Sequence, residues 1–558
     1  MIKLRLKNYI DSCFVRGIEL GYWSAAAAGG YAVEEPKFEE QGDFSCNAAM
    51  VIAGKEKKAG GKKQSPRQVA EQLLALLGRE SELYDRAEIA GPGFMNFFIR
   101  PAIWQSVVPE VCKQGDRFGL AVDKNGKRVL VEFVSANPTG PLSVGHGRQA
   151  VLGDAIARLL AASGYEVERE YYYNDAGRQM RVLGESTRAR YCELLGLPCQ
   201  FPEDGYQGQY IYDIARELVA KYGDALKDTV EVTPFKEAAE KAIFADIDRT
   251  LKRLDIVFDT YYNEHSLYEN GLVDDVVTTL RDKGLVYDKD GAVWFRTTAF
   301  GQEQDRVIIK SSGEPTYRLP DIAYHREKFR RGYDWMVDIF GADHIATVPD
   351  VLAGVKALGY DDAKVTVVLH QFVTLLRDGQ QVKMSTRKAN FVTVDELLDE
   401  VGPDAARFFF LMRKADSQLE FDLDLATRQS QENPVYYVQY AHARLVSIAR
   451  QAAEKGVNAG DLAVAPLHLL TTPEEQRLMK AMAGWPALVQ DAARELAPHR
   501  IVYFLQELAG LFHSYYNKHK VLSDDDELSR ARLWFCAGLR TVLRNGLVLL
   551  AMSAPEQM

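Results

Sequence analysis

The chain has 558 residues, of which 47% are apolar and 26% charged, an ordinary globular composition that excludes a disordered chain and a fibrous rod. Its formal net charge of −10 argues against a protein that coats nucleic acid without regard to sequence. Residues 1–110 carry 14 basic and 14 acidic side chains and residues 426–558 carry 14 and 13, so the acidic excess lies in residues 111–425. Both ends of the chain could therefore meet a polyanion at little electrostatic cost.

No apolar run reaches the roughly 18–20 residues that span a bilayer, and the N-terminus lacks the continuous hydrophobic stretch of a secretory signal. The six cysteines form no CxxC pair, and the closest two, Cys192 and Cys199, are seven residues apart. This spacing argues against a structural zinc site or a disulfide framework, and free cysteines fit a reducing compartment. We expect a cytoplasmic protein with no membrane partner.

Residues 1–110 are predicted to form a small α+β domain. Helical spacing of apolar residues runs through 67–77, and 91–99 is typical of a turn entering a buried strand, with Phe94 and Phe98 among the residues expected inside. The lysine-rich segment 55–63 between them has two interpretations. It is either a solvated loop or a basic segment that contacts RNA phosphates.

Residues 111–425 are predicted to form a Rossmann-type domain with a parallel sheet. A strand at 128–134, a helix at 148–164 and a strand at 165–175 make one βαβ unit. A second set begins near residue 335 with a strand, a helix at 348–358 and another strand. The stretch of about 190–300 between the two sets is strongly helical and is predicted to be an insertion.

Residues 426–558 are predicted to be a helix bundle. Four long amphipathic segments follow one another there, separated by turns rich in Pro, Gly or Asp. The expected fold class is therefore α/β, with a Rossmann-type catalytic domain that carries helical insertions, an N-terminal α+β domain and a C-terminal all-α bundle.

Two segments carry residue types suited to phosphate chemistry. NPTGPLSVGH at 137–146 lies between a predicted parallel strand and its helix, where the helix N-terminus offers free N–H groups and the positive end of its dipole. KMSTRK at 383–388 is a basic loop that could close over a triphosphate. Taken singly, the first could be a glycine-rich turn with an incidental histidine and the second a solvated run of charges.

Together, these two segments resemble the HIGH and KMSKS elements of class I aminoacyl-tRNA synthetases. The stretches VEFVSANPTGPLSVGHG, YYNDAGRQM, GEPTYRLPDIAYH and NPVYYVQYAHARL further resemble arginyl-tRNA synthetases, and the resemblance covers nearly the whole chain. It implies ligation of L-arginine to tRNA-Arg through an arginyl-adenylate, with ATP and Mg²⁺ used and AMP and pyrophosphate released. It also implies that residues 1–110 and 426–558 contact tRNA; we expect a monomer.

The resemblance assigns site residues, and their chemistry is consistent with it, because a guanidinium needs several acceptors. Those expected to bind arginine are Glu132, Asn137, Tyr317 and Asp321. Those expected to bind ATP are Ser143, Gly145, His146, Gly341, His344, Gln371, Lys383 and Met384. The expected catalytic residues are His146, Lys383, Ser385 and Arg387, those expected to bind tRNA are Tyr436 and Tyr440, and no metal ligands are expected in the protein itself.

The sequence departs from the family pattern at three positions. Ser143 stands where the first histidine of HIGH is usual, and Thr386 stands where the second lysine of KMSKS is usual. Pro320 interrupts YRLPD, so the helix there is expected to start at Pro320, with Tyr317 and Asp321 on different faces. Three alternatives stay open: another class I synthetase, a nucleotidyltransferase, and a tRNA-binding protein that has lost catalysis.

Overall fold

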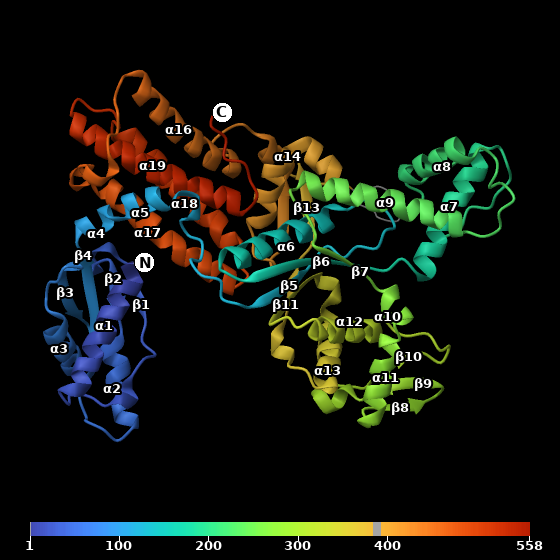
Figure 1. Ribbon diagram of the computed structural model, residues 1–558, viewed down its shortest axis with the longest axis horizontal. Helices are drawn as coiled ribbons and strands as arrows, with labels where there is room; N and C mark the ends of the chain where they lie inside the picture. The colour runs from blue at the N-terminus through green and yellow to red at the C-terminus, as the bar shows by residue number, and fades with distance from the viewer. Residues whose placement is uncertain (1, 383–391) are drawn as a thin grey trace.

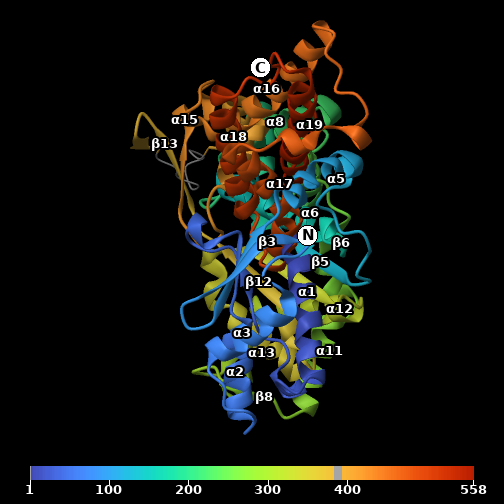
Figure 2. The ribbon, with the colours of Figure 1, turned by 90° about the vertical axis from the view of Figure 1, so that its left-hand side faces the viewer.

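The computed structural model describes residues 2–382 and 392–558. The N-terminal region lies beside the C-terminal helices, and the central parallel sheet separates both from a helical projection at the far end (Figures 1 and 2). Among the described helices, none is long and apolar enough to cross a membrane.

The N-terminal region is an antiparallel sheet covered by helices. The sheet order is β1-β2-β4-β3, and β4 pairs with both β2 and β3. The expected helix and strand are present as α3 and β4, but Phe94 is 38% exposed and Phe98 half-buried, since alternate residues of β4 face away from the core. The elements are α1 (Ile2–Glu19), β1 (Val33–Glu34), β2 (Phe44–Cys46), α2 (Ala48–Lys58), α3 (Pro66–Leu77), β3 (Tyr84–Ala90), β4 (Phe94–Ile99), α4 (Pro101–Gln105) and α5 (Val107–Gln114).

The lysine-rich segment is only partly a loop. Lys55, Lys57 and Lys58 lie in the last turn of α2, and Lys55 Nζ donates to the carbonyl oxygen of Gly29 at 3.0 Å. Lys62 donates to the carbonyl oxygen of Gly21. Two of the five lysines thus hold the neighbouring loop, while Lys57, Lys58 and Lys63 are exposed.

The central region contains the predicted parallel sheet, in the order β12-β11-β5-β6-β7 with every neighbouring pair parallel. Its elements are β5 (Arg128–Glu132), α6 (Val144–Ala162), β6 (Glu166–Tyr173), α7 (Gly177–Leu194), α8 (Gln209–Tyr222), α9 (Thr233–Arg253), β7 (Thr260–Asn263), α10 (His265–Glu269), α11 (Leu272–Asp282), α12 (Arg318–Arg330), β11 (Trp335–Gly341), α13 (Val348–Leu358) and β12 (Val365–His370). Two smaller sheets flank it, made of β8 (Val286–Lys289), β9 (Ala292–Phe295) and β10 (Arg306–Ile309), and of β13 (Val373–Arg377), β14 (Gln380–Gln381) and β15 (Leu419–Asp422).

The structure corrects three expectations for this region. The range 190–300 is not a purely helical insertion, because it contains β7, which pairs with β6, and the antiparallel strands β8 and β9. Helix α6 begins at Val144, four residues earlier than expected, because Ser143 caps it. Helix α12 begins at Arg318, so Pro320 lies within its first turn rather than at its start.

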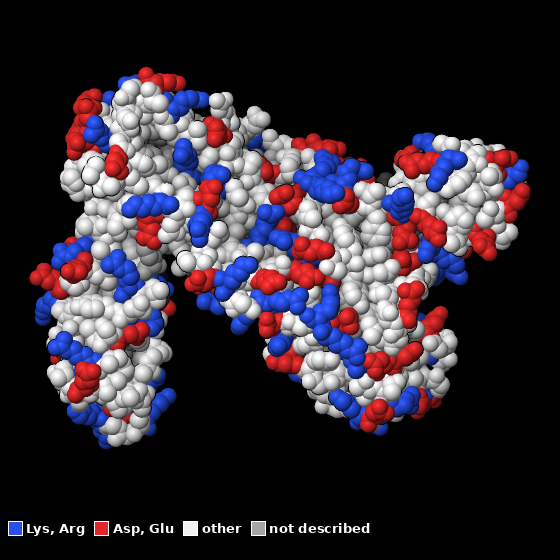
Figure 3. All heavy atoms as spheres, viewed as in Figure 1, with Lys and Arg blue, Asp and Glu red and all other residues white. Residues whose placement is uncertain are grey.

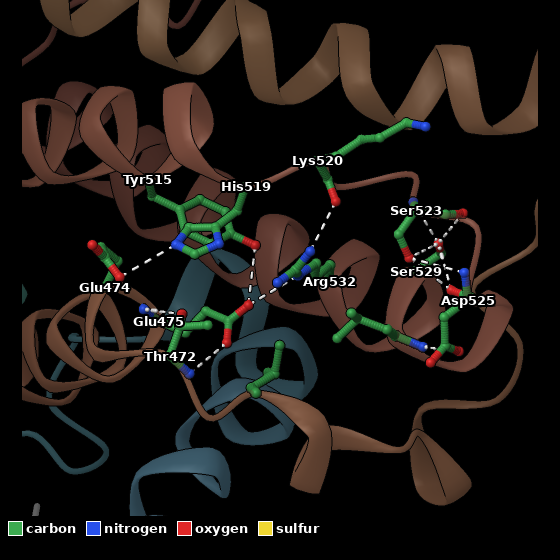
Figure 4. Close-up of polar contacts among 12 residues, drawn as sticks. Thr472, Glu474, Glu475, Tyr515, His519, Lys520, Ser523, Asp525, Ser529 and Arg532 are labelled. Carbon is green, nitrogen blue, oxygen red and sulfur yellow. Dashed lines mark hydrogen bonds and ion pairs between the residues drawn. The ribbon is translucent and has the colours of Figure 1, made fainter.

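The C-terminal region consists of the four predicted helices. They are α16 (Pro434–Glu454), α17 (Pro473–Arg494), α18 (His499–Lys518) and α19 (Asp526–Leu549). Figure 4 shows a buried polar cluster that ties three of them together: Glu475 on α17 accepts from Arg532 Nε on α19 at 3.0 Å and from the Tyr515 hydroxyl on α18 at 3.3 Å. Glu475 also accepts from the Thr472 backbone N–H at 3.0 Å, which completes a capping box.

Helix α14 (Val394–Leu411), followed by α15 (Leu423–Thr427), connects the central sheet to the bundle. Arg407 on α14 is fully buried and uses three nitrogens. Nε donates to the carbonyl oxygen of Leu550 at 2.7 Å, Nη1 to that of Leu254 at 2.7 Å, and Nη2 to Asp154 on α6 at 2.5 Å. One guanidinium therefore joins the end of the bundle to helix α6, which Ser143 caps.

Replacing Arg407 with Met is expected to lower the free energy of unfolding of this region by about 3–5 kcal/mol. The cause is that the carbonyl oxygens of Leu550 and Leu254 lose a buried donor, while Asp154 loses one cation and keeps Arg158 Nε at 2.7 Å. Urea-induced unfolding followed by tryptophan fluorescence measures the loss. Arg428→Met is the matched control, because the Arg428–Glu432 pair is more than half exposed and its loss should stay within about 0.5 kcal/mol. Equal effects of the two substitutions would contradict the joining role.

Candidate active site

A cavity of about 770 Å³ opens at the carboxyl ends of β5, β11 and β12. This edge of a parallel sheet is where α/β proteins bind ligands. Nine of the residues expected to bind arginine or ATP line the cavity: Glu132, Asn137, Ser143, Gly145, His146, Tyr317, Asp321, Gly341 and His344. They come from segments more than 200 residues apart, so the fold brings the two predicted ligand sites into one space.

The SVGH turn forms the start of α6. Ser143 is the N-cap, and its backbone N–H donates to His146 Nδ1 at 3.2 Å. Burial lowers the pKa of His146, so the imidazole is neutral at physiological pH. Because Nδ1 accepts that hydrogen bond, the ring proton is on Nε2. His146 can thus donate from Nε2 to a phosphate oxygen beside the helix N-terminus.

Gly145 is open toward the cavity. A Cβ placed there would meet only Ser143 Oγ, at 3.7 Å, an ordinary contact. The described protein atoms leave this side of Gly145 open, so a ligand can approach the backbone closely there.

A buried ion cluster lies behind the cavity. Lys328 Nζ contacts Glu132 Oε2 at 2.6 Å and Asp338 Oδ1 at 2.7 Å, and His325 Nε2 lies 2.9 Å from Asp338 Oδ2. Burial raises the pKa of Glu132, whereas the attraction of Lys328 and the hydrogen bond from His325 overcome burial and lower the pKa of Asp338. Glu132 therefore lines the cavity as expected, but its carboxylate is already paired with Lys328.

The chain that leaves β5 is strained where it turns. Val134 has φ 66° and Ser135 has φ 43°, a left-handed conformation that a β-branched residue adopts only at a cost. The turn directs Ser135 Oγ to Glu132 Oε1 at 3.0 Å and lets it accept from the Tyr172 backbone N–H at 3.2 Å. The hydrogen bond from Ser135 thus helps to hold the Glu132 carboxylate in the cavity wall.

Three carboxylates face the same side of the cavity. Glu264 accepts from the Tyr172 hydroxyl at 2.9 Å and from Asn174 Nδ2 at 2.8 Å, and it lines the cavity together with Asp321 and Glu132. Burial, reinforced by the charges of Glu264 and Glu132, raises the pKa of Asp321 to about 7. These three carboxylates outnumber the one buried ammonium group, that of Lys328, so the cavity favours a cationic ligand.

Asn137 and Tyr317 are placed differently from one another. Asn137 Oδ1 accepts from the Asn174 backbone N–H at 3.0 Å and Nδ2 donates to Gln179 Oε1 at 3.1 Å, so its amide ties the loop to the start of α7. Tyr317 is the N-cap residue of α12 and is 86% exposed at the cavity mouth. Asp321, one turn further on, faces inward.

The other side of the cavity carries Gly341, His344 and His370. Burial lowers the pKa of His370 to about 4, which leaves it neutral. Gln371 follows it, and its carbonyl oxygen accepts from Arg148 Nη1 at 2.6 Å. Arg148 lies on α6 two residues after His146, and its Nη2 donates to the carbonyl oxygens of Lys414 and Ser417 at 3.0 and 2.9 Å. The helix that carries His146 thereby also holds the segment that carries Gln371.

Three family models match the chain in order. Arginyl tRNA synthetase N terminal domain matches residues 17–99, tRNA synthetases class I (R), catalytic domain, matches residues 107–415, and DALR anticodon binding domain matches residues 438–558. The chain belongs to the arginyl-tRNA synthetase family. The expected fold class is confirmed with it.

Relatives of known name agree with this arginyl-tRNA synthetase assignment. The chain is 62% identical over 558 residues to Arginine--tRNA ligase of Desulfotalea psychrophila and 49% identical over 560 residues to that of Syntrophotalea carbinolica, with 100% of each chain covered. The solved arginyl-tRNA synthetase of Thermus thermophilus has a TM-score of 0.76 over 100% of both chains at 23% identity, which shows the shared fold.

Part of the expected arginyl-tRNA synthetase site lies outside the described residues. This concerns the KMSTRK loop, with Lys383, Met384, Ser385 and Arg387. Its flanks are placed: Val394 N donates to the carbonyl oxygen of Leu142 at 2.8 Å, and Thr393 forms a β-bridge with Ser143. The segment that follows the loop therefore lies beside the SVGH turn.

The expected tRNA contacts form a ladder of rings on α16. Tyr436 and Tyr440 stack with centroids 6.1 Å apart and planes at 8°, and His513 stacks on Tyr440 at 5.7 Å. The guanidinium of Arg444 lies 4.8 Å from the rings of both Tyr440 and Tyr516. A partly exposed aromatic ladder with an arginine is suited to stacking unpaired bases.

Sequence reasoning missed Glu264, His325, Lys328 and Arg148. A signal was present for two of them, since Asp321, His325 and Lys328 are spaced i, i+4 and i+7 and so share one face of α12. No local signal marks Glu264 or Arg148, whose partners are 90 or more residues distant.

Arginine binding is expected to release a proton at pH values below about 7. The reason is that Asp321 is then protonated in the free protein and must ionise to pair with a guanidinium. Affinity should accordingly weaken as the pH falls from 7 to 5. Calorimetric titrations in two buffers with different ionisation enthalpies measure the proton count. The raised pKa of Asp321 also affects the stability of the ligand-free protein. Between about pH 4 and pH 7 the folded state binds more protons than the unfolded state, so the free energy of unfolding falls as the pH rises.

Proposed function

We propose that this chain joins L-arginine to tRNA-Arg in two steps, with ATP as the energy source. Membership of the arginyl-tRNA synthetase family supports arginine charging of tRNA, and the cavity supplies a chemical reason for the choice of amino acid. The observation that carries the proposal is the set of three carboxylates, Glu132, Glu264 and Asp321, in the same cavity as the SVGH turn.

In the first step the carboxylate of arginine attacks the α-phosphorus of ATP, which forms arginyl-adenylate and releases pyrophosphate. The nucleophile belongs to the substrate, so the protein contributes position and charge stabilisation. Asp321 and Glu264 accept hydrogen bonds from the guanidinium. His146 Nε2–H and the N-terminus of α6 meet the phosphates, and we propose that Lys383 and Arg387 neutralise the leaving pyrophosphate.

We propose that Gly341 and His344 line the adenosine side of the site. Gln371 is not among the residues that line the cavity, and its expected contact with adenosine stays a proposal. Mg²⁺ would arrive with ATP, since this ion commonly binds to one or two carboxylates and substrate phosphates. No group of three or more His, Cys, Asp or Glu side chains in the described part of the chain could hold a metal ion. Asp343 lines the cavity, its charge acts on His146, and it would provide a carboxylate ligand.

In the second step the 2′-hydroxyl of the terminal ribose of tRNA attacks the acyl carbon, and AMP leaves. We propose that the Tyr436–Tyr440 ladder stacks anticodon bases while the N-terminal region contacts another part of the same tRNA. Figure 3 shows a hollow below the bundle, between the N-terminal region and the part of the molecule that carries α12 and α13. Acidic and basic side chains are interspersed on this face, so we expect tRNA to be guided by local basic groups. We further propose a cytoplasmic monomer, for which light scattering should give about 62.6 kDa.

The test is ATP–pyrophosphate exchange with arginine, lysine and citrulline, with and without tRNA. Citrulline has nearly the shape of arginine but no charge, so it isolates the contribution of the carboxylates. We expect exchange with arginine alone, and we propose that it depends on tRNA, which the family resemblance implies. Exchange with lysine or citrulline at a comparable rate would overturn the specificity argument. Binding of tRNA without any exchange would favour a protein that has lost catalysis.

A further inference from the structure

The three helices α7, α8 and α9 form the projection at the right of Figure 1, and each of them contacts a loop beside the cavity. The contacts join Gln179 Oε1 on α7 to Asn137 Nδ2 at 3.1 Å, the Tyr210 hydroxyl on α8 to the carbonyl oxygen of Thr139 at 2.8 Å, and Lys236 Nζ on α9 to the carbonyl oxygen of Asp175 at 3.1 Å. Two of these contacts reach segment 137–146, which carries Asn137 and His146 in the cavity wall. The projection thus supports the segment that is expected to meet arginine and ATP.

The ring of Tyr210 fits against this segment because two glycines leave it room. A Cβ on Gly208 would lie 2.2 Å from Tyr210 Cε1, and a Cβ on Gly140 would lie 3.0 Å from the hydroxyl oxygen and 3.2 Å from Cζ. Neither glycine has a positive φ, so the backbone conformation does not require glycine at these positions, whereas the ring does. The next residue on α8, Ile211, is fully buried, which fixes the helix end that carries Tyr210.

Thr139 connects this contact to residues that line the cavity. Its N–H donates to the carbonyl oxygen of Asn137 at 2.7 Å, so residues 137–139 form a tight turn. Pro138 and Pro141 fix φ on either side of Thr139, which leaves the turn little freedom to adjust locally. Ser143, four residues after Thr139, caps α6. A displacement of the Thr139 carbonyl group is therefore expected to move both Asn137 and the start of α6.

We propose that Tyr210 is a positioning residue for the formation of arginyl-adenylate, and that the projection holds segment 137–146 in its reactive geometry. This inference rests on the proposed function, because that reaction is the one that the geometry serves. Tyr210 is not among the residues that line the cavity, so it acts through the carbonyl oxygen of Thr139. A displacement of about 1 Å in such a supporting segment costs up to about 10²-fold in rate, since the attacking carboxylate and the α-phosphorus must be aligned.

The test compares Tyr210→Phe, which keeps the ring and removes the hydroxyl, with Tyr212→Phe on the same helix. The Tyr212 hydroxyl donates to Glu193 at 2.9 Å, and neither residue lines the cavity. In ATP–pyrophosphate exchange with arginine and tRNA, we expect kcat to fall about 10–100-fold in Tyr210→Phe and to stay unchanged in Tyr212→Phe. The rate is expressed per active site, counted from the adenylate burst, so that unfolded protein does not contribute. Equal kcat values in the two variants would overturn the proposal.

The Gly140→Ala variant disturbs the same contact from the other side. Its Cβ pushes against the Tyr210 ring, so we expect kcat to fall in this variant as well. Because both substitutions act through one contact, the double variant with Tyr210→Phe should lose less than the product of the two single losses. Losses that multiply would show that the hydroxyl and the turn act independently, which would contradict the proposal.

Amide hydrogen exchange of the ligand-free, full-length protein tests the contact without any activity. We expect the amides of residues 139–146 to exchange several-fold faster in Tyr210→Phe and at the unmodified rate in Tyr212→Phe. Unchanged hydrogen exchange in both variants would refute the positioning role. If the unmodified chain shows no pyrophosphate exchange with arginine, the proposed function fails, and hydrogen exchange still decides whether Tyr210 holds the turn.

Discussion

Replacing Asp321 with Asn is expected to lower kcat/KM for arginine in ATP–pyrophosphate exchange by about 10⁴–10⁵-fold. A site built from buried polar groups discriminates by roughly this factor when one partner is lost, since the remaining groups are left unpaired. Asn keeps the shape of Asp321 but cannot supply the charge that a guanidinium requires. The Asp321→Ala variant should behave similarly, with the fold preserved in both.

The stability of the Asp321→Asn protein distinguishes a binding role from a structural one. Burial already disfavours the ionised carboxyl, whose pKa is raised to about 7, so its removal should leave the thermal midpoint of the ligand-free protein unchanged or slightly higher. Glu314→Gln is a matched control, because Glu314 is exposed on the turn before α12 and pairs with Lys310 at 3.4 Å. Exchange near the unmodified rate in the Asp321 variant would refute the assigned role.

Replacing Lys328 with Met is expected to destabilise the central region by about 3–5 kcal/mol. Lys328 is completely buried between Glu132 and Asp338, and removing it leaves two carboxylates without their cation. We also expect arginine binding to weaken, because Glu132 loses the contact that holds its carboxylate. Urea-induced unfolding and calorimetric titration with arginine measure the two effects.

A double variant provides the control for Lys328. Lys328→Met combined with Asp338→Asn removes one of the two orphaned charges, so it should recover part of the stability lost in the single variant. A double variant that is less stable than Lys328→Met would show that Asp338 contributes independently of Lys328. A single variant as stable as the unmodified protein would mean that the cluster does not depend on its cation.

Helices and strands whose apolar residues follow a regular spacing could be predicted from the sequence. The βαβ unit around the SVGH turn and the four C-terminal helices follow from apolar periodicity, and the structure confirms them. Strand β7 has only four residues and follows a helix of 21 residues, so its pattern was hidden within a helical stretch. Phe94 was expected inside because apolar composition was given more weight than the alternation of a strand with one exposed face.

The composition of the cavity could be predicted only in part. Nine of the residues that the family resemblance assigns to arginine or ATP line one cavity and Gln371 does not, and their roles as ligand contacts stay predictions. That Glu132 is bound by Lys328, 196 residues later, is a fact of tertiary packing with no local signature. The same holds for Glu264, whose partners Tyr172 and Asn174 lie on the neighbouring strand and the loop that follows it.

The contacts of Arg407 also set an order of events during synthesis. Arg407 donates to the carbonyl oxygen of Leu550, which lies 143 residues later in the chain. Gln105 likewise donates to the carbonyl oxygen of Leu470, 365 residues later. At about 5–20 residues per second, a ribosome needs roughly 7–30 s to make the segment between Arg407 and Leu550. During that interval the nascent chain carries a guanidinium whose burial is incomplete. We therefore expect α14 to be among the last helices to become protected from proteases as the chain emerges.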